Sequence, residues 1–444
     1  MSGVPTSRLL EIGRGVVTLA QRLGAEEVSV SVSSGTSTEL SRRDGRVEKA
    51  QESRSLAASV ELMVDGRFSS HSTNDLRPEA FQPFLERAIA ATRFLEPDPD
   101  RALPPREQMG VADANLDLVD PEQAALGPDQ RRAWVEEMEA RTLAAAAKLP
   151  VRSATAYVWD GRSETAWVTS HGFEEESART SFGHGATLSL EDQDGRLPEG
   201  WSMVGASHRA DMPSVGWLAE DAAANAARRL GAKPITSGRY PMLLDRRAVG
   251  RVLGTLLSPL GGTSLYEGRS CMAGKRGQRV ASSAFTLRDE PLIPRGSGSR
   301  RSDSDGIPAI ARNIVEDGVL QMYFIDVYNS RRMAEAVTMG GPSNLVIAPG
   351  DASPVELIRA LPQVIRVEGF LGGNSNAASG DFSFGVQGSL LERGEVVASL
   401  AEMNVSGNIF DLMERYQTAA NDPWIFSAWR CPTLLFDDVQ FSGT

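Results

Sequence analysis

Hydrophobic positions recur at helical spacing in four segments of the first half of the chain. These segments are residues 8–23, 78–93, 130–148 and 217–230, where apolar residues fall three or four positions apart. Between them the pattern changes to alternation. Val28, Val30 and Val32 alternate with serines, and residues 57–64, 68–70 and 151–206 have similar strand patterns. The order helix, strands, helix thus occurs twice, which suggests an internal duplication.

Asp-Gly-Arg tripeptides give the two halves a second common feature. They begin at Asp44 and Asp65 in the first half and at Asp160 and Asp194 in the second. Asp-Gly favours tight hairpins because a type I′ turn needs positive φ at both central positions. We therefore predict a hairpin turn at each of the four. Since Asp-Gly is also the commonest hairpin signal, duplication and coincidence both remain open.

The composition shifts to Gly and Ser after residue 231. Strand patterns are predicted at residues 280–287, 319–325, 345–348, 364–370, 382–391, 395–403 and 434–441, and helices at 246–257, 330–336, 354–361 and 407–417. The predicted fold class is α+β, with two helix and antiparallel-sheet units followed by a large, mostly antiparallel, β-rich domain. The predicted division is an N-terminal unit at 1–95, a Pro/Asp-rich connector at 96–126, a second unit at 127–230 and the β-rich domain at 231–444.

Charge and composition narrow the function classes. The 444 residues carry a net charge of −12, which disfavours binding to nucleic acids and anionic lipids. There is no run of 18 apolar residues to span a bilayer, so we expect no membrane role. Two cysteines, Cys271 and Cys431, are too few for a disulfide framework. The first residues lack the pattern of a signal peptide, and we expect a cytoplasmic protein.

No self-sufficient catalytic motif is present. The chain lacks a phosphate-binding loop, a dinucleotide-binding glycine fingerprint and a nucleophile elbow. The four histidines, His71, His171, His184 and His208, are not spaced for a metal on a helix. His171 and His184 lie in adjoining strand patterns and could approach each other. Hydrogen-bonded histidines at strand ends are the simpler interpretation, and a metal-independent enzyme centred on them is one alternative.

The segment around residue 250 is the most informative part of the sequence. Asp245 is a candidate N-cap, and the apolar face of the helix that follows is formed by Ala248, Val249, Val252, Leu253, Leu256 and Leu257. The polar positions at the start of this helix are the three arginines Arg246, Arg247 and Arg251. The sequence predicts a helix docked on the core with a cationic first turn.

From this segment onward the chain resembles the TldD/PmbA peptidase family. The similarity rests on the order of short motifs, which are Arg246-Arg247-Ala248-Val249-Gly250-Arg251, Gly268-Arg269-Ser270, Gly274-Lys275-Arg276-Gly277, Asp289-Glu290-Pro291, Asp305-Gly306-Ile307-Pro308, Glu316-Asp317-Gly318, Ser379-Gly380-Asp381-Phe382-Ser383, Gly394-Glu395, Ser406-Gly407-Asn408 and Pro432-Thr433-Leu434-Leu435. Asp65-Gly66-Arg67 extends the similarity to the first region, so that it spans nearly the whole chain.

The departure from the family pattern is as informative as the match. In TldD-type members the matching helix carries H-E-x-x-x-H, and the corresponding positions here are Arg246, Arg247 and Arg251. Guanidinium groups have no lone pair to donate to zinc. The late thiolate ligand of TldD-type members also has no counterpart, because Cys431 lies too near the end. The resemblance therefore implies a TldE (PmbA)-type chain that binds no cofactor, with zinc only in a TldD-type partner.

The arginines and a later glycine-rich segment each have two interpretations. Arg246, Arg247 and Arg251 either pair with local carboxylates or face solvent, or they form a seat for a carboxylate or a substrate. The second segment contains Gly372, Gly373, Asn374, Asp381, Phe382 and Ser383. It is either a hairpin loop without a ligand or an exposed edge to which an extended peptide adds as a strand.

The resemblance implies a metal-free subunit of a cytoplasmic metalloprotease that acts on unfolded or leader peptides. Its partner would be a TldD-type zinc subunit that supplies catalysis, and we expect no hydrolysis by this chain alone. A stand-alone peptide-binding or scaffold protein, possibly a homodimer, is the alternative from another class.

Overall fold

The computed structural model describes residues 6–443. Its helices are α1 Thr6–Arg22, α2 Pro78–Thr92, α3 Pro128–Ala145, α4 Val215–Ala227, α5 Val249–Leu257, α6 Gly262–Tyr266, α7 Val327–Met333, α8 Pro354–Arg359 and α9 Ile409–Glu414. Its strands are β1 Glu27–Arg43, β2 Arg46–Val64, β3 Arg67–Thr73, β4 Val151–Thr169, β5 Glu174–Leu190, β6 Glu199–Ala206, β7 Gly238–Leu244, β8 Leu287–Asp289, β9 Arg312–Glu316, β10 Val319–Leu320, β11 Leu345–Val346, β12 Gln363–Ser375, β13 Asp381–Glu392, β14 Glu395–Asn408, β15 Tyr416–Ala419, β16 Trp429–Arg430 and β17 Leu434–Ser442. The predicted α+β class is confirmed.

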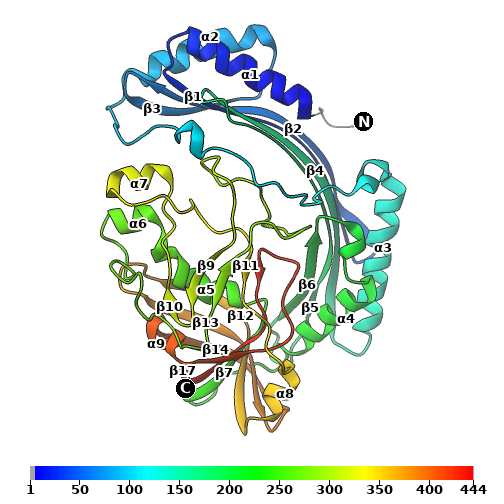
Figure 1. Cartoon of the computed structure of the whole chain (residues 1–444). Coiled ribbons are helices and arrows are strands. Elements are labelled where there is room, and N and C mark those ends of the chain that lie inside the picture. Colours follow the sequence, from blue (N-terminus) through cyan, green and yellow to red (C-terminus); the bar gives the residue numbers. More distant parts are fainter. Residues whose placement is uncertain (1–5, 444) are drawn as a thin grey trace.

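The first half of the chain forms one curved antiparallel sheet. Its strand order is β3-β2-β1-β4-β5-β6, so each predicted unit contributes three consecutive strands. The two units join through a long pairing of β1 with β4, from Ser29 opposite Thr169 to Arg43 opposite Thr155. In Figure 1 the sheet arches over the rest of the molecule, with α1 and α2 outside it at the top and α3 and α4 outside it on the right. This order is what a duplicated unit would produce, and the duplication itself stays a prediction.

The helices cover the sheet by burying the apolar faces that the sequence pattern predicted. The α1 and α2 faces pack with β1, β2 and β4 into one core that includes Leu9, Val30, Leu62 and Leu85. The α3 and α4 faces pack on the other half of the sheet. All four helices begin and end within three residues of the predicted bounds, because their burial follows the 3.6-residue period.

The predicted turn at Asp160 is wrong. Asp160 and Gly161 lie inside the continuous strand β4, opposite Phe182 and Ser181 of β5. The Asp160 carboxylate is buried and accepts hydrogen bonds from Arg131 Nε at 2.6 Å and from Gln123 Nε2 at 3.0 Å. A Cβ at position 161 would lie 2.8 Å from the Thr36 carbonyl oxygen. Asp160 therefore forms a buried ion pair, and Gly161 allows the neighbouring strand to approach closely. The dipeptide makes no turn.

The other Asp-Gly pairs do lie in turns. Asp44 and Gly45 have positive φ between β1 and β2, and Asp65 and Gly66 have positive φ between β2 and β3. Gly195 has positive φ in the connection from β5 to β6.

Residues 238–442 contain two further sheets. One has the order β14-β13-β12-β7-β17-β15, and an additional pairing of β14 with β17 closes it on itself. The other is a smaller sheet of order β10-β9-β8-β11-β16. Helix α5 lies in the core between them, with Val249, Val252, Leu253, Leu256 and Leu257 all buried. Figure 1 shows this region enclosed by the concave side of the N-terminal sheet.

Several strand predictions in this region were too long. Residues 280–287 form no strand before Leu287, although Val280, Ala281 and Phe285 are buried in the core. Their backbone bonds are irregular, as in the bond from Val280 N–H to the Gly318 carbonyl. The alternating apolar residues are thus buried although this segment does not form a strand. Helix α5 also begins later than predicted, and Asp245 accepts the Arg247 N–H in the preceding turn.

Arg101 and Arg179 make two of the contacts that hold the N-terminal region against the C-terminal region. In the connector, the Arg101 guanidinium lies 4.5 Å from the Phe68 ring centroid of β3 and 3.7 Å from the Tyr328 ring centroid of α7. From β5, Arg179 donates to the carbonyl oxygens of Ser297 at 2.5 Å and Ser299 at 2.8 Å. Within residues 6–443, we find no helix that is both long and apolar enough to cross a membrane.

His184 makes the stability of this fold depend on pH. It lies in β5 with its ring 5.5 Å from that of Trp134 on α3, and the side chain is 7% exposed. Among the described residues its Nε2 has no hydrogen-bond partner. Burial, assisted by the charge of Arg209, lowers the pKa of His184 from 6.5 to about 4. Below pH 6.5 His184 is therefore protonated in the unfolded chain, whereas in the folded chain it is protonated only near pH 4.

We expect the free energy of unfolding to fall as the pH drops from 6.5 to 4, with about 3 kcal/mol of that loss due to His184. In the His184→Phe variant, which cannot take up this proton, the decline should be shallower by that amount. Denaturant unfolding of both proteins across this pH range measures the difference. Equal losses in the two proteins would show that His184 is not held neutral by the fold.

Candidate functional site

The three predicted arginines lie where β7 runs into α5. Arg246 and Arg247 occupy the turn after the strand, and Arg251 lies in the first turn of the helix. The sharp turn is fixed by Asp245, whose N–H donates to the Val367 carbonyl of β12 and whose carbonyl accepts the Ala248 N–H. The structure brings the three side chains to one end of the core helix but points them at different partners.

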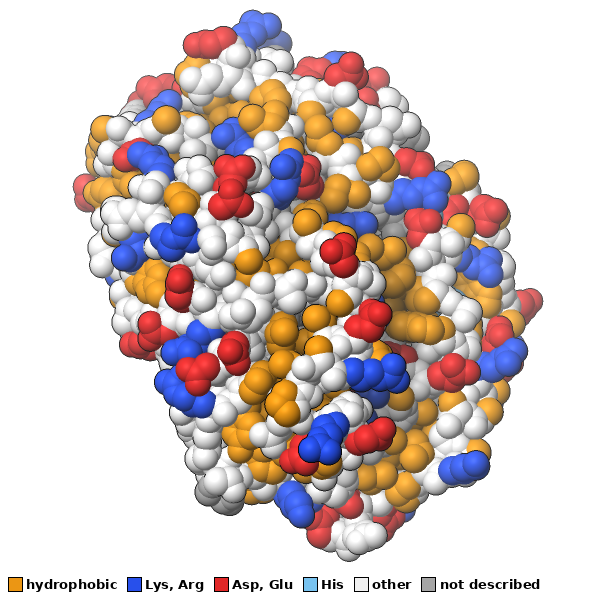
Figure 2. All heavy atoms as spheres, turned by 60° about the horizontal axis from the view of Figure 1, so that its bottom comes forward, with side chains coloured by type: hydrophobic (Ala, Val, Ile, Leu, Met, Phe, Trp, Pro, Cys, Tyr) orange, Lys and Arg blue, Asp and Glu red, His pale blue; other side chains and the backbone are white. Residues whose placement is uncertain are grey.

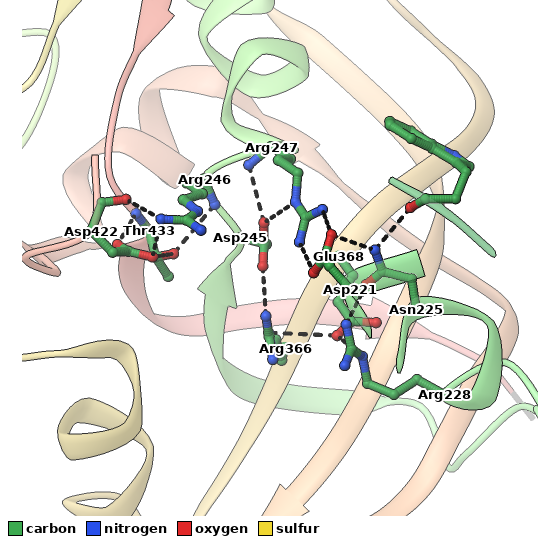
Figure 3. Close-up of polar contacts among 11 residues, drawn as sticks. Asp221, Asn225, Arg228, Asp245, Arg246, Arg247, Arg366, Glu368, Asp422 and Thr433 are labelled. Atoms are coloured by element: carbon green, nitrogen blue, oxygen red, sulfur yellow. Dashed lines mark hydrogen bonds and ion pairs between the residues drawn. The ribbon is translucent and has the colours of Figure 1, made fainter. Parts of the chain in front are cut away.

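Arg247 belongs to a ring of alternating charges between α4, the turn before α5 and β12. Figure 3 shows how these side chains face one another. In order around the ring, the members are Asp221, Arg247, Asp245, Arg366, Glu368, Arg228 and Asn225.

The first half of the ring is the more tightly bonded. Arg247 donates to both carboxylate oxygens of Asp221, with Nη1 to Oδ2 at 2.7 Å and Nη2 to Oδ1 at 3.1 Å. Its Nε lies 3.6 Å from Asp245 Oδ1, and Arg366 Nη2 donates to Asp245 Oδ2 at 2.7 Å. Bidentate guanidinium-carboxylate pairs of this kind are the strong ones.

The second half closes the ring through an amide. Arg366 Nε lies 3.6 Å from Glu368 Oε1, and Arg228 Nε lies 2.6 Å from the same oxygen. Arg228 also donates to Asn225 Oδ1, and Asn225 Nδ2 donates to Asp221 Oδ2 at 3.2 Å. Three guanidinium groups thus balance three carboxylates.

The electrostatics of the ring follow from this pairing. Burial alone would raise the pKa of Asp221, but the hydrogen bonds from Arg247 hold that pKa below its ordinary value. Burial likewise opposes ionisation of Asp245, and the charges of Arg366 and Arg247 outweigh it and lower its pKa. The pKa of Arg247 is raised despite burial by its bonds to Asp221. All of these groups are therefore charged at neutral pH.

Arg246 is bound to the C-terminal strand region. Its backbone N–H donates to Thr433 Oγ1 at 3.3 Å, and its Nη1 donates to the Asp422 carbonyl at 3.1 Å. The guanidinium carbon lies 4.9 Å from the Trp424 ring centroid, and Trp424 is buried. Arg246 therefore has a structural role that leaves it unavailable to a ligand.

Arg251 is the exposed member of the three. Its Nη2 donates to the Gly373 carbonyl at 2.7 Å, and its guanidinium lies 4.6 Å from the Phe384 ring centroid. Within residues 6–443, we find no carboxylate within 4 Å of Arg251. Of the three predicted arginines, it is the one that remains open to an added anion.

A pocket of about 380 Å³ lies beside Arg251. Its lining residues are Trp201, Asn225, Arg228, Arg229, Asp245, Arg247, Ala248, Arg251, Glu368, Gly369, Phe370, Gly372 and Gln387. It lies between the end of the N-terminal sheet and β12. Figure 2, which turns the bottom of Figure 1 toward the reader, shows hydrophobic side chains lining a hollow with arginine or lysine and acidic side chains around it.

Strand β12 changes from an interior strand to an edge strand along its length. Ile365, Arg366 and Val367 pair with β7 on one side while β13 pairs on the other. From Glu368 onward β7 is absent and only β13 remains. The register with β13 shifts at Glu368 and again after Leu371, where Gly372 and Gly373 both have positive φ. Residues 368–371 therefore offer an open strand edge that forms one wall of the pocket.

The glycine-rich segment is split between edge and interior. Gly372, Gly373 and Asn374 lie at the exposed end of β12. Asp381, Phe382 and Ser383 lie in β13, which is paired with β12 on one side and with β14 on the other. The main chain at those three positions is already hydrogen-bonded, so a further strand can add only to β12.

The histidines do not form a centre. His171 contacts the Pro104 carbonyl through Nδ1 at 2.8 Å and Glu27 through Nε2 at 3.2 Å, whereas His184 lies in the core beneath Trp134. Cys431 is buried and burial raises its pKa to about 12, while Cys271 is half-buried. No group of three His, Cys, Asp or Glu side chains in residues 6–443 is arranged to hold a metal ion.

The sequence interpretation missed most of the residues around the pocket. Arg228 and Arg229 were visible only as a basic pair at the end of a predicted helix, and Arg366 and Glu368 only as the polar positions of a predicted strand. Trp201 carried no signal. Their separation along the chain hid their common location.

Family comparisons agree with this architecture over nearly the whole chain. The descriptions that match are "PmbA/TldA metallopeptidase domain 1" at residues 28–92, the "central domain" at 121–230 and the "C-terminal domain" at 237–443. A crystal structure of a candidate modulator of DNA gyrase from Bacteroides thetaiotaomicron superposes with a TM-score of 0.92 at 32% identity, and the match covers 98% of each chain. TldE from Thermococcus kodakarensis has the same fold, with a TM-score of 0.85 at 19% identity over 97% of this chain and 100% of that chain.

The named relatives divide by how much of the chain they match. Metalloprotease PmbA of Escherichia coli O157:H7 is 24% identical over 95% of this chain and 92% of its own length. A TldD homologue from Haemophilus influenzae is 26% identical over 46% of this chain and 45% of its own length. Fold and site thus define a protein with a metallopeptidase architecture and three arginines at the start of its core helix. The chain belongs to the PmbA/TldD metallopeptidase family.

The ring makes a testable contribution to stability. Asp245→Asn removes the carboxylate that lies between Arg247 and Arg366 and leaves part of their charge uncompensated in a mostly buried setting, which costs about 3 kcal/mol. We expect a clear drop in the thermal unfolding midpoint. Asp75→Asn, which removes the partner of the exposed Arg77, is the matched control and should leave the midpoint unchanged. A similar midpoint for both variants would mean that the ring contributes no more than a surface pair.

Proposed function

We propose that this chain is the metal-free, TldE-type subunit of a metallopeptidase whose zinc and catalysis come from a TldD-type partner. The observation that carries the proposal is the engagement of Arg246 and Arg247 by Asp422, Asp221 and Asp245. The resemblance places Arg246 at the first histidine and Arg247 at the glutamate of the H-E-x-x-x-H motif that zinc-bearing members carry. A guanidinium cannot donate a lone pair to a metal, and ion pairs fix these two in place.

The pattern of relatives supports the same assignment. Two PmbA relatives match along nearly the full chain and two other PmbA homologues match about half of it, whereas two TldD homologues match a little under half. The relatives carry the name metalloprotease, and a pair in which one subunit holds the metal reconciles that name with the arginines of this chain. We place the complex in the cytoplasm on the low cysteine content.

The proposed contribution of this subunit is to bind extended substrate. Residues 368–371 present unpaired main-chain groups to which an unfolded peptide could add as a strand, with affinity from backbone hydrogen bonds that tolerate many sequences. Leu371 is 56% exposed beside this edge and offers apolar contact to alternate side chains. Unfolded or leader peptides fit such an edge because their backbones are free.

The first experiment is peptide hydrolysis by this chain alone, by a cognate TldD-type homologue alone and by their mixture. We expect the lone chain to be inert and free of zinc, and activity to appear on mixing and disappear with a chelator. The control is a partner in which the glutamate of its H-E-x-x-x-H motif is changed to glutamine, which should assemble but not cleave.

Two outcomes would contradict the proposal. Hydrolysis or bound metal in the lone chain would place a catalytic centre within it. No association and no activity with any TldD-type homologue would favour the stand-alone peptide-binding or scaffold protein.

Hydrogen exchange tests the peptide edge separately. Outward-facing amides in residues 368–371 have no strand partner and should exchange quickly in the free chain. A short N-acetylated peptide of alternating threonine and valine should slow that exchange, while β13 amides, which are already paired on both sides, should change little. Protection confined to other segments would mean that peptide does not add to this strand.

A further inference from the structure

Two guanidinium groups on the wall of the pocket stand outside the balanced ring. Arg251 donates to the Gly373 carbonyl, and Arg229, just beyond α4, donates to the Glu199 carbonyl of β6. Neither lies within 4 Å of a carboxylate in residues 6–443, while the three ring arginines each do. Both line the same pocket, which therefore carries uncompensated positive charge.

Of the two cations, Arg229 has the less favourable electrostatic surroundings. Burial lowers its pKa, and the charge of neighbouring Arg228 adds to that effect, with Glu368 and Glu199 opposing it only in part. A partly buried cation without a bonded counter-ion gains from an added anion, because a charge-assisted hydrogen bond is stronger where water is partly excluded. Arg229 also lines the adjoining pocket of about 240 Å³, so it lies where the two hollows meet.

The other residues that line the pocket indicate which kind of molecule would carry the anionic group. Trp201, 46% exposed on β6, and the half-buried Phe370 of β12 supply aromatic surface. The open edge of β12 supplies main-chain partners at residues 368–371, and it ends at the Gly372-Gly373 bulge. A bulge interrupts strand pairing, so a strand added to this edge must be short. Arg251 holds the carbonyl of that bulge and therefore stands where the added strand stops.

We propose that this pocket binds the carboxylate at the end of an extended peptide, with Arg229 and Arg251 as the contacting cations. The carboxylate comes either from the C-terminus of the peptide or from an acidic side chain at its last residue. This inference rests on the proposed peptide-binding function, since the edge of β12 holds the peptide backbone. Two guanidinium groups suit a single carboxylate, and the ring carboxylates Asp245 and Glu368 on the same wall disfavour a more highly charged anion.

Arg246 and Arg247 take no part in this seat. Both are held by other partners. Of the three arginines expected from the sequence, Arg251 alone contributes to the proposed seat, and Arg229 is its second cation. The ring has a positioning role, because the pairs of Arg228 with Glu368 and of Arg247 with Asp221 fix the end of α4 that carries Arg229 against β12. Arg251 is bonded to the Gly373 carbonyl farther along β12.

Calorimetric titration of this chain alone tests the seat with three short N-acetylated peptides of alternating threonine and valine. One ends in a free carboxylate, one in an amide, and one in glutamate followed by a terminal amide. We expect the free acid to bind about tenfold more tightly than the plain amide, as one charge-assisted hydrogen bond requires. Tight binding of the glutamate peptide would identify a side-chain carboxylate as an alternative ligand. Weak binding of it would restrict the seat to the C-terminus.

Substitutions at the two arginines test whether they are the groups that contact the carboxylate. Arg251→Gln and Arg229→Gln should each weaken the free acid about tenfold and remove most of its advantage over the amide, while leaving amide binding unchanged. Arg229→Lys, which keeps the charge, should recover part of the loss. Arg359→Gln on α8 is the matched control, since that arginine is exposed and outside the pocket. Because Arg251 is exposed, its variant tests the seat even if substitution at Arg229 disturbs folding.

Equal affinities for acid and amide, unchanged discrimination in both glutamine variants, or no binding of any peptide would overturn the inference. These results are separable from the proposed subunit role. Discrimination without activity on mixing would keep the seat and remove the protease assignment, whereas activity without discrimination would do the reverse.

Discussion

A ring of alternating arginine and carboxylate side chains holds three distant parts of this chain together. Asp221 and Arg228 come from the last helix of the N-terminal region, Arg247 and Asp245 from the turn before α5, and Arg366 and Glu368 from β12. Each charge is mostly buried, so none is stable without its neighbours. The geometry of the pocket, the course of β12 and the docking of α4 on the C-terminal sheet all depend on this one network.

The ring also shows how arginines are accommodated beside a core helix. Positive charge next to such a helix is costly unless carboxylates are within reach. Here Asp221 reaches Arg247 from another region of the chain, and Asp422 lies beside Arg246. Arg246 and Arg247 thus serve as a structural joint between distant parts of the chain.

The curved N-terminal sheet and the pocket are linked through the same joint. The long pairing of β1 with β4 makes one wall of two sequence units, and the α4 region supplies Asp221, Asn225 and Arg228 to the ring. Strand β12 supplies Arg366 and Glu368 where it leaves β7 and becomes an edge. Because the edge starts at the residues that close the ring, the cations and the free backbone lie in the same place.

The sequence by itself determined the elements whose burial follows a period, namely the four N-terminal helices, the apolar face of α5 and the long alternating strands, because side-chain direction repeats locally. It also determined that Arg246, Arg247 and Arg251 cannot ligate zinc, since that is a property of the guanidinium group. Only the tertiary structure decided that Asp160 is interior to a strand, that Phe382 lies between two paired strands and that Arg229 faces the same pocket as Arg251. Those facts depend on which distant segments become neighbours, and local patterns carry no record of it.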